Sequence, residues 1–279
     1  MNLIVQGNDI PTASLKALAK LTSATAIEAL SSTAFKLVSA DESQRPDVAA
    51  YCDAQALDCG WVPAERRISD FGLLVMDMDS TLITIECIDE IADMQGLKPQ
   101  VSAITEAAMR GEIDFAESLR QRVSLLEGLD ESALQRVYDE RLKLSPGAET
   151  LLATLQAAGI KTLLVSGGFT FFTERLKPRL SLNYTAANTL EIVDGKLTGR
   201  VLGDIVDAQG KADWLNRVRS ELNLVPAQVI AMGDGANDLK MMAEAGVSIA
   251  YRAKPVVREQ ASHALSQVGL DGILPLLGR

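Results

Sequence analysis

Residues 71–82 read Phe-Gly-Leu-Leu-Val-Met-Asp-Met-Asp-Ser-Thr-Leu, an apolar run followed at once by two aspartates. An apolar run without polar alternation indicates a strand that is buried on both faces, as in a parallel sheet covered by helices. Helical patterns separate it from four further runs of this kind, at 161–165, 184–187, 229–232 and 247–250. We therefore predict an α/β fold with a doubly wound, Rossmann-like parallel sheet.

Two regions inside this pattern need a separate interpretation. About 80 residues of mostly helical pattern separate the first two strands, far more than one crossover helix requires. We predict that residues 84–145 form an inserted helical cap and that residues 148–158 form the crossover helix. Later in the chain, Leu190-Glu-Ile-Val-Asp-Gly-Lys-Leu-Thr198 predicts a β-hairpin that interrupts the sheet pattern, because Asp-Gly favours a type I′ turn.

Residues 1–66 predict a small domain of their own. Short apolar strands and helical patterns alternate there in the order β-α-β-β-α-β, which indicates an α+β module. This order is similar to that of ACT-type modules, which often bind amino acids or mediate association. The polar segment 63–70 is expected to be a linker, and residues 67–279 are expected to form the larger domain that carries the cap. We expect the small module to serve dimerisation or packing, with amino-acid binding as the alternative.

The composition argues against several classes of protein. The chain has 279 residues, 47% of them hydrophobic, and a formal net charge of −10, so two modest domains can bury a sizeable core. The negative charge repels phosphate backbones, which argues against nucleic acid as a partner. A signal-peptide pattern and an apolar stretch long enough for a membrane span are both absent from the sequence. Three cysteines suit a reducing compartment, so the expected location is the cytoplasm.

The chain contains a single histidine, His263, and therefore one candidate base for a Ser-His-Asp or Cys-His mechanism. It lies in Ala-Ser-His-Ala, far from any nucleophile elbow. We expect its side chain to be hydrogen-bonded or solvated and to have no catalytic role.

Polar clusters directly follow three of the predicted strands. Asp77-Met-Asp-Ser-Thr81 follows the first, Ser166-Gly-Gly168 the second and Gly233-Asp-Gly-Ala-Asn-Asp238 the fourth. Ligands bind beyond the carboxyl ends of strands in open α/β sheets, so these clusters should meet in one site. Two carboxylates about 4 Å apart repel by roughly 4 kcal/mol at an effective dielectric constant near 20, so a bound cation is expected. Oxygen ligands without histidine or thiolate favour Mg²⁺.

A Mg²⁺ site with carboxylates, a small hydroxyl group, glycine amides and a lysine suits phosphoryl transfer. The sequence has no GxxxxGK[ST] loop to hold a nucleoside triphosphate. The economical mechanism is covalent: an ionised aspartate attacks phosphorus, and a second aspartate protonates the leaving oxygen and then activates water. The expected partner is a small-molecule phosphate monoester.

These residues resemble the haloacid dehalogenase superfamily of phosphatases, all four of whose motifs occur in order. The motifs are Asp77-Met-Asp-Ser-Thr81, Ser166 after a strand, Lys211 in Gly-Lys-Ala-Asp, and Gly233-Asp-Gly-Ala-Asn-Asp238. The position between the first two aspartates is methionine, where this superfamily often has phenylalanine, and this apolar exchange changes little.

The resemblance implies a role for each polar residue of these motifs. Asp77 is expected to be the nucleophile and Asp79 the general acid/base. The carboxylates of Asp77 and Asp234 and the backbone carbonyl of Asp79 are expected to bind Mg²⁺, with Asp238 supporting the metal from nearby. The residues expected to bind substrate are Ser166, Gly167 and Lys211, which hold the phosphoryl group, and Asn237, which contributes to binding the substrate or the intermediate.

Substrate choice is expected to lie in the helical insert, because the core motifs recognise only the phosphoryl group. At about 100° per residue, Arg122 falls on the apolar face of a helix over 115–126, whereas Arg120 points to solvent. A charged group on an inward face needs a partner, either an internal ion pair or an anionic ligand. A substrate carboxylate suits the guanidinium fork of Arg122. Glu86 alone reads as an acid in the first turn of a helix, and together with Arg122 it suits an amino acid.

A longer resemblance, to the phosphoserine phosphatases, implies that Glu86 and Arg122 bind substrate. It rests on residues 77–86, 88–92, 118–126, 165–169 and 233–238. The implied function is Mg²⁺-dependent hydrolysis of O-phospho-L-serine to L-serine and phosphate through an aspartyl-phosphate, the last step of L-serine biosynthesis. One alternative is a sibling phosphatase or phosphotransferase for another small phosphorylated amine or acid. Another is a signalling receiver phosphorylated on aspartate, against which the helical insert and Asp79 argue. The oligomeric state is left open, with a homodimer as one outcome.

Overall fold

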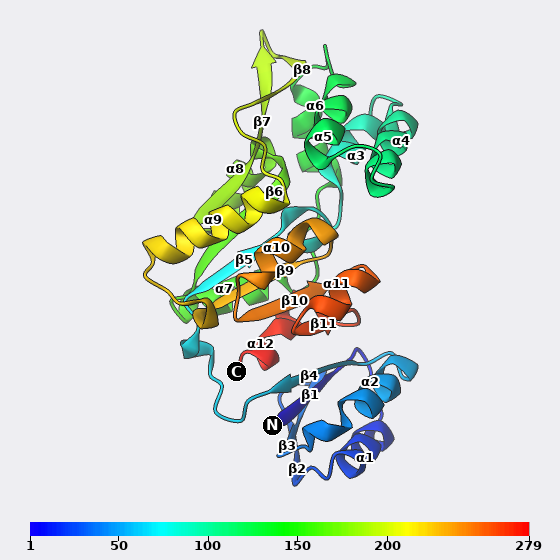
Figure 1. Ribbon diagram of the computed structural model, residues 1–279, viewed down its shortest axis with the longest axis vertical. Coiled ribbons are helices and arrows are strands. Elements are labelled where there is room, and N and C mark those ends of the chain that lie inside the picture. The colour runs from blue at the N-terminus through cyan, green and yellow to red at the C-terminus, as the bar shows by residue number, and fades with distance from the viewer. Residues whose placement is uncertain (279) are drawn as a thin grey trace.

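A seven-stranded sheet forms the centre of the computed structural model, which describes residues 1–278 apart from the side chain of Met109. Its strands are β5 (Leu73–Met76), β6 (Lys161–Phe169), β7 (Tyr184–Val193), β8 (Lys196–Leu202), β9 (Val229–Gly233), β10 (Val247–Tyr251) and β11 (His263–Leu265). Their order is β11-β10-β9-β5-β6-β7-β8. Strands β11 to β7 pair in parallel and β8 pairs antiparallel with β7. The strand β5, which Asp77 directly follows, therefore lies in the middle of the sheet (Figure 1).

Helices cover both faces of this sheet. Leu74 and Met76 of β5 belong to the hydrophobic core shared with α7 (Ala148–Ala157), α8 (Thr170–Arg179) and α12 (Ile273–Leu276). Leu73 and Val75 point the other way, into the core shared with α9 (Ala208–Glu221), α10 (Leu239–Ala243) and α11 (Pro255–Gln260). Successive residues of a strand point to opposite faces, so an uninterrupted apolar run serves two cores at once. The predicted doubly wound α/β fold is confirmed.

Four helices lie between β5 and α7, at the end of the molecule that is farthest from the N-terminal sheet (Figure 1). They are α3 (Cys87–Asp93), α4 (Lys98–Met109), α5 (Phe115–Ser124) and α6 (Ser132–Arg136), followed by a helical turn over Val137–Arg141. The two segments that connect them to the sheet pair with each other: Ile83 bridges to Leu144, and the Thr84 N–H donates to the Lys143 carbonyl at 2.9 Å. Within residues 1–278, no helix combines the length and apolar character needed to cross a membrane.

The N-terminal part of the chain forms a second, antiparallel sheet. Its strands β1 (Asn2–Gln6), β2 (Ala26–Ala29), β3 (Ala34–Val38) and β4 (Asp58–Val62) have the order β2-β3-β1-β4. Together with α1 (Thr12–Leu21) and α2 (Arg45–Ala54) they form a split β-α-β arrangement. Leu3 and Trp61 face the helices, whereas Ile4 and Val62 on the opposite face join the core of the larger sheet. The two sheets therefore share apolar packing as well as one chain.

A buried carboxylate reinforces this contact. Asp58 of β4 accepts hydrogen bonds from three successive backbone N–H groups of residues 266–268, at 2.8, 2.8 and 3.2 Å. Gln6 of β1 adds a side-chain bond to the carbonyl of Gly272 at 2.9 Å. Burial raises the pKa of Asp58 although these backbone bonds oppose the shift. Such a convergent set of N–H groups is a favourable place for an anion.

The predicted hairpin is confirmed: the end of β7 and the start of β8 pair antiparallel on either side of the turn. The hairpin does not interrupt the sheet, because β7 runs without a break to Val193 and β8 returns beside it as the last strand of the central sheet. Its turn is as predicted, with positive φ at Asp194 (51°) and Gly195 (74°). The predicted linker is also not entirely irregular, since Ile68–Asp70 forms a short 3₁₀ helix. The hairpin projects far enough for Leu197 to bond with the backbone of Leu129, which follows α5.

The expectation that the His263 side chain is hydrogen-bonded or solvated is wrong, because this side chain is buried and one of its ring nitrogens has no partner among residues 1–278. His263 begins β11, an edge strand that the sequence pattern did not reveal, and it is buried where β4 packs against this edge. Its Nδ1 atom has no hydrogen-bond partner within the part of the chain that the structure describes. Burial lowers the pKa of His263 to about 4, and the positive charges of Arg66 and Arg45 contribute. The side chain is therefore neutral at pH 7.

We expect His263→Leu to make stability less dependent on pH between about 6.5 and 4. The unfolded chain binds a proton at His263 with a pKa near 6.5, so the stability present above this pH is lost as the pH falls toward the folded value of about 4. At pH 5 the lowered pKa of His263 reduces the free energy of unfolding by about 2 kcal/mol relative to pH values above 6.5. Urea unfolding at about pH 7 and pH 5 compares the two proteins. An equal loss of stability between pH 7 and pH 5 in the wild type and in His263→Leu would contradict the expectation.

Candidate active site

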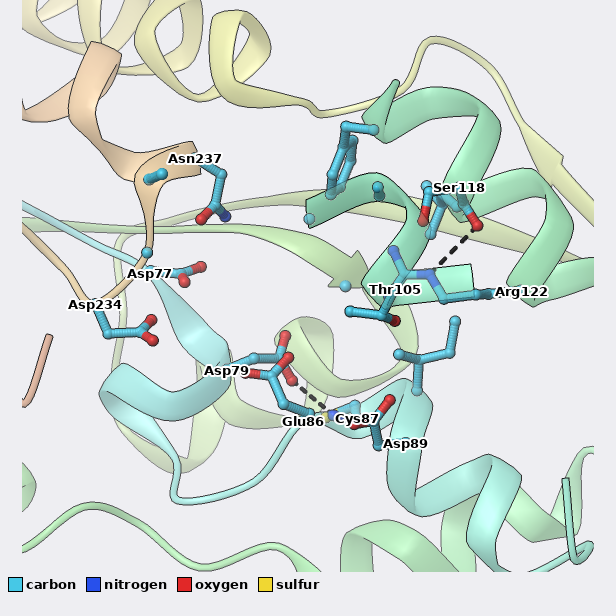
Figure 2. A pocket seen from close by; sticks show the side chains of 18 of the residues that line it. Asp77, Asp79, Glu86, Cys87, Asp89, Thr105, Ser118, Arg122, Asp234 and Asn237 are labelled. Atoms are coloured by element: carbon cyan, nitrogen blue, oxygen red, sulfur yellow. Dashed lines mark hydrogen bonds between the residues drawn. The ribbon is translucent and has the colours of Figure 1, made fainter. Parts of the chain in front are cut away.

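A pocket of about 490 Å³ lies between the carboxyl ends of β5, β6 and β9 and the helices α3, α4 and α5. Figure 2 shows Asp77, Asp234 and Asn237 on the sheet side of this pocket and Ser118 and Arg122 on the facing helix. Ser166 and Asp238 are buried and do not line it. The other predicted site residues do line it: Asp77, Asp79, Glu86, Arg122, Gly167, Lys211, Asp234 and Asn237. The structure thus brings residues from five separate stretches of sequence to one place.

A tight loop after β5 positions the first acidic residues. Ser80 adopts a left-handed backbone conformation (φ 55°), and its N–H donates to the Ile85 carbonyl at 3.2 Å. The loop therefore turns back on itself, and the Ser80 hydroxyl donates to Glu86 Oε1 at 2.6 Å. Glu86 precedes α3, and its side chain makes no capping bond to that helix. Burial raises the pKa of Glu86 to about 7, with Asp79 as the next cause. Glu86 is thus directed to the pocket rather than to its own helix.

Both carboxylate oxygens of Asp79 accept hydrogen bonds. Oδ1 accepts the Cys87 N–H at 2.8 Å, and Oδ2 accepts the Ser166 hydroxyl at 3.1 Å. Ser166 Oγ in turn accepts the Gly168 N–H at 2.8 Å. Burial raises the pKa of Asp79, although the hydrogen bonds from Cys87 and Ser166 act in the opposite direction. This environment favours a carboxyl group that can hold a proton, as a general acid must.

Lys211 connects two aspartates inside the pocket wall. Its Nζ donates to Oδ1 of Asp77 and to Oδ1 of Asp238, both at 2.7 Å, and all three side chains are buried. Asp207 caps α9 by accepting the Gly210 N–H at 2.8 Å, which fixes the helix turn that carries Lys211. Burial alone lowers the pKa of Lys211, but the two carboxylates outweigh this effect and raise it. Lys211 therefore remains an ammonium group.

One carboxylate oxygen each from Asp77, Asp234 and Asp238 lies within 4.8 Å of the others. Burial raises the pKa of Asp234 to about 6 and that of Asp77 well above its ordinary range, and the negative charge of Asp238 is the next cause in both. One lysine does not neutralise three carboxylates, so the cluster attracts a further positive charge. Its donor set consists only of oxygen atoms, which suits a hard divalent cation.

Arg122 lies on the pocket face of α5, as its spacing predicted, and Arg120 is exposed. Its Nε donates to the Ser118 carbonyl at 3.3 Å. Burial lowers the pKa of Arg122, and the nearby charges of Asp89 and Glu86 oppose this shift. No carboxylate of residues 1–278 forms a close ion pair with it. Of the two partners that the sequence left open, the internal ion pair is not the one observed.

Two positioning residues were not recognised in the sequence. Asn188 donates to the Gly167 carbonyl at 2.8 Å and accepts the Val206 N–H at 2.8 Å, so it joins the loop around Gly167 to the start of α9. Asn188 directly follows the predicted strand 184–187, so its place at the carboxyl end of a strand is visible in the sequence. The second is Thr81, the last residue of the motif that begins at Asp77, whose hydroxyl donates to Asp234 at 3.4 Å.

Comparison with known proteins agrees with this arrangement. A family model described as haloacid dehalogenase-like hydrolase matches residues 74–243, and a domain of unknown function matches residues 3–48. A phosphoserine phosphatase of Polaromonas sp. is 56% identical over 218 residues, covering 76% of this chain and 92% of the relative. The structure of a probable phosphoserine phosphatase from Vibrio cholerae aligns with a TM-score of 0.87 at 41% identity, covering 99% of this chain and 86% of that one.

A second solved structure shows a phospho-aspartyl intermediate analogue of phosphoserine phosphatase, with a TM-score of 0.69 and 38% identity over 74% of this chain and 98% of that one. The fold, the aspartate cluster and these matches define a haloacid dehalogenase-like hydrolase. More particularly, the chain belongs to the phosphoserine phosphatase family.

We expect Lys211→Met to destabilise the protein by about 3–5 kcal/mol in a buffer without divalent cations, because Asp77 and Asp238 lose their buried counter-charge. Lys240→Met is the matched control, since Lys240 is less buried and donates only to Gln209 at 3.3 Å. Urea unfolding measures both variants. Equal stability of Lys211→Met and wild type would show that the two aspartates are not ionised together.

Proposed function

We propose that this chain hydrolyses O-phospho-L-serine to L-serine and phosphate with Mg²⁺ as cofactor, as the last step of L-serine biosynthesis in the cytoplasm. The observation that supports this substrate most directly is one pocket that holds Asp77 on the sheet side, Arg122 on the facing helix and Glu86 beside Asp79. The Asp77 side suits a phosphoryl group, Arg122 suits the carboxylate of an amino acid, and Glu86 suits its ammonium group.

The covalent chemistry is assigned to the two aspartates after β5. Asp77 attacks phosphorus and forms an aspartyl-phosphate, while Asp79 gives its proton to the leaving serine oxygen. Asp79 then takes a proton from the water that hydrolyses the intermediate, so it returns to its starting state. The raised pKa of Asp79, which burial causes, suits the first of these steps. A divalent cation held by Asp77, Asp234 and the Asp79 carbonyl, with Asp238 nearby, supplies neutralisation of the phosphoryl oxygens.

The phosphoryl group is assigned to Ser166, Gly167, Lys211 and Asn237. An ammonium group has three N–H donors, and Lys211 uses two of them on Asp77 and Asp238, which leaves one for a phosphoryl oxygen. Glycine at position 167 leaves room for the Phe115 ring in the pocket wall, because a Cβ atom there would lie 2.9 Å from that ring. Ser166 reaches the same region through its bond to Asp79.

The remaining expectations stay proposals of the same kind. Residues 1–66 are proposed as an ACT-like domain and residues 67–279 as the catalytic domain, with the cap over about 84–145. A homodimer is compatible with the exposed edge strand β2, all of whose residues are exposed. Nucleic acid and membranes are not proposed as partners, since the net charge is −10.

A substrate panel tests the proposal. We expect phosphate release from O-phospho-L-serine that depends on added Mg²⁺, with much slower release from sugar phosphates, because only an amino acid satisfies both Arg122 and Glu86. Asp77→Asn should abolish turnover while the circular dichroism spectrum is unchanged. Good release from sugar phosphates with none from phosphoserine contradicts the substrate assignment.

We expect Arg122→Ala to reduce kcat/KM for phosphoserine at least about 10-fold, the value of a lost hydrogen bond to a charged group. Hydrolysis of a generic aryl phosphate should change little, since that substrate has no carboxylate. Arg120→Ala, two residues away on the exposed face of the same helix, is the control. Equal losses on both substrates would instead indicate a structural role for Arg122.

A further inference from the structure

The hydroxyl group of Ser118 on α5 is an unexplained polar group in the pocket wall. Ser118 is 1% exposed, and its Oγ has no hydrogen-bond partner among the residues that the structure describes. Its backbone N–H donates to the Asp114 carbonyl at 3.0 Å, as the helix requires. A buried polar group without a partner costs about 1–3 kcal/mol, so each such group needs a reason.

The position of Ser118 suggests the reason. Ser118 lines the pocket, and Arg122 follows one helical turn later on the same face (Figure 2). The bond from Arg122 Nε to the Ser118 carbonyl holds the guanidinium against the turn that carries the hydroxyl. Two kinds of donor, a guanidinium and a hydroxyl, therefore lie side by side at the end of the pocket that is farther from Asp77.

The chemistry of these donors selects one ligand group. A carboxylate has two oxygens and about four lone-pair sites, so it can accept from Arg122 and from a hydroxyl at the same time. An ammonium group is repelled by Arg122. The phosphoryl group belongs with Asp77 on the opposite side of the pocket and with Lys211, which donates to Asp77. The remaining acceptor of a phosphorylated amino acid is its carboxylate.

We propose that the Ser118 hydroxyl donates a hydrogen bond to the substrate carboxylate beside Arg122 and thereby contributes to the selection of amino-acid phosphates. This inference rests on the proposed function, since it assigns one more contact within that site. Ser118 is a binding residue here, and it takes part in no proton transfer.

The test compares Ser118→Ala with wild type on two substrates that differ in the carboxylate alone, O-phospho-L-serine and O-phosphoethanolamine. We expect kcat/KM for phosphoserine to fall about 10- to 100-fold, mainly through KM, as for a lost hydrogen bond to a charged group. We expect kcat/KM for phosphoethanolamine to stay unchanged. Equal losses on the two substrates, or no loss on either, overturn the proposal.

Thermal unfolding without substrate gives a second, independent measurement. Ser118→Ala removes a hydroxyl that has no partner, so we expect the Tm to be unchanged or raised. A lowered Tm would show that the hydroxyl is bonded within the protein and would overturn the proposal. Ser124→Ala is the matched control on the same helix, because Ser124 Oγ already donates to the Gln121 carbonyl at 2.8 Å. A wild-type enzyme active on phosphoethanolamine but not on phosphoserine would refute the proposed function itself, a distinct result.

Discussion

Burying Lys211 between Asp77 and Asp238 is the constraint on which the site depends. Each contact is 2.7 Å long and lies inside the pocket wall, so removing Lys211 would leave two buried carboxylates without their shared counter-charge. The three residues come from the ends of β5 and β9 and from the first turn of α9. Only a parallel sheet with α9 packed on it brings these three points together, so the electrostatics of the site and the topology of the fold require each other.

This arrangement also explains how a chain with a net charge of −10 can accept an anionic ligand. Asp234 adds a third carboxylate to the cluster, and the excess of negative charge there attracts a cation instead of excluding phosphate. Arg122 supplies positive charge from the facing helix and has no close ion pair of its own within residues 1–278. Net charge therefore describes the long-range field of this protein and not the potential inside its pocket.

The sequence predicted those features that depend on local patterns. The apolar runs predicted the fold class, and the polar clusters after β5, β6 and β9 predicted part of the pocket lining, including Asp77, Gly167 and Asp234. The edge strand β11 and the burial of His263 were not predictable, because both depend on packing against β4, some 200 residues earlier in the chain. The bonds of Lys211 and the orphaned hydroxyl of Ser118 likewise exist only in three dimensions. Asn188 differs, since its place directly after the predicted strand 184–187 can be read from the sequence.

A loop over residues 266–270 also makes contacts that could not be predicted from local sequence patterns. Residues 266–268 receive Asp58 from the N-terminal sheet, and two residues later the Leu270 N–H donates to the Pro146 carbonyl at 2.7 Å. Ser145, next to Pro146, bonds to the carbonyls of Thr81 and Leu82, at the base of the segments that carry α3–α6. One loop thus supports the docking of the N-terminal sheet and the attachment of the helices above the pocket. Because residues 266–270 contribute only backbone groups to these bonds, their side chains carry no record of this connection, and the structure alone reveals it.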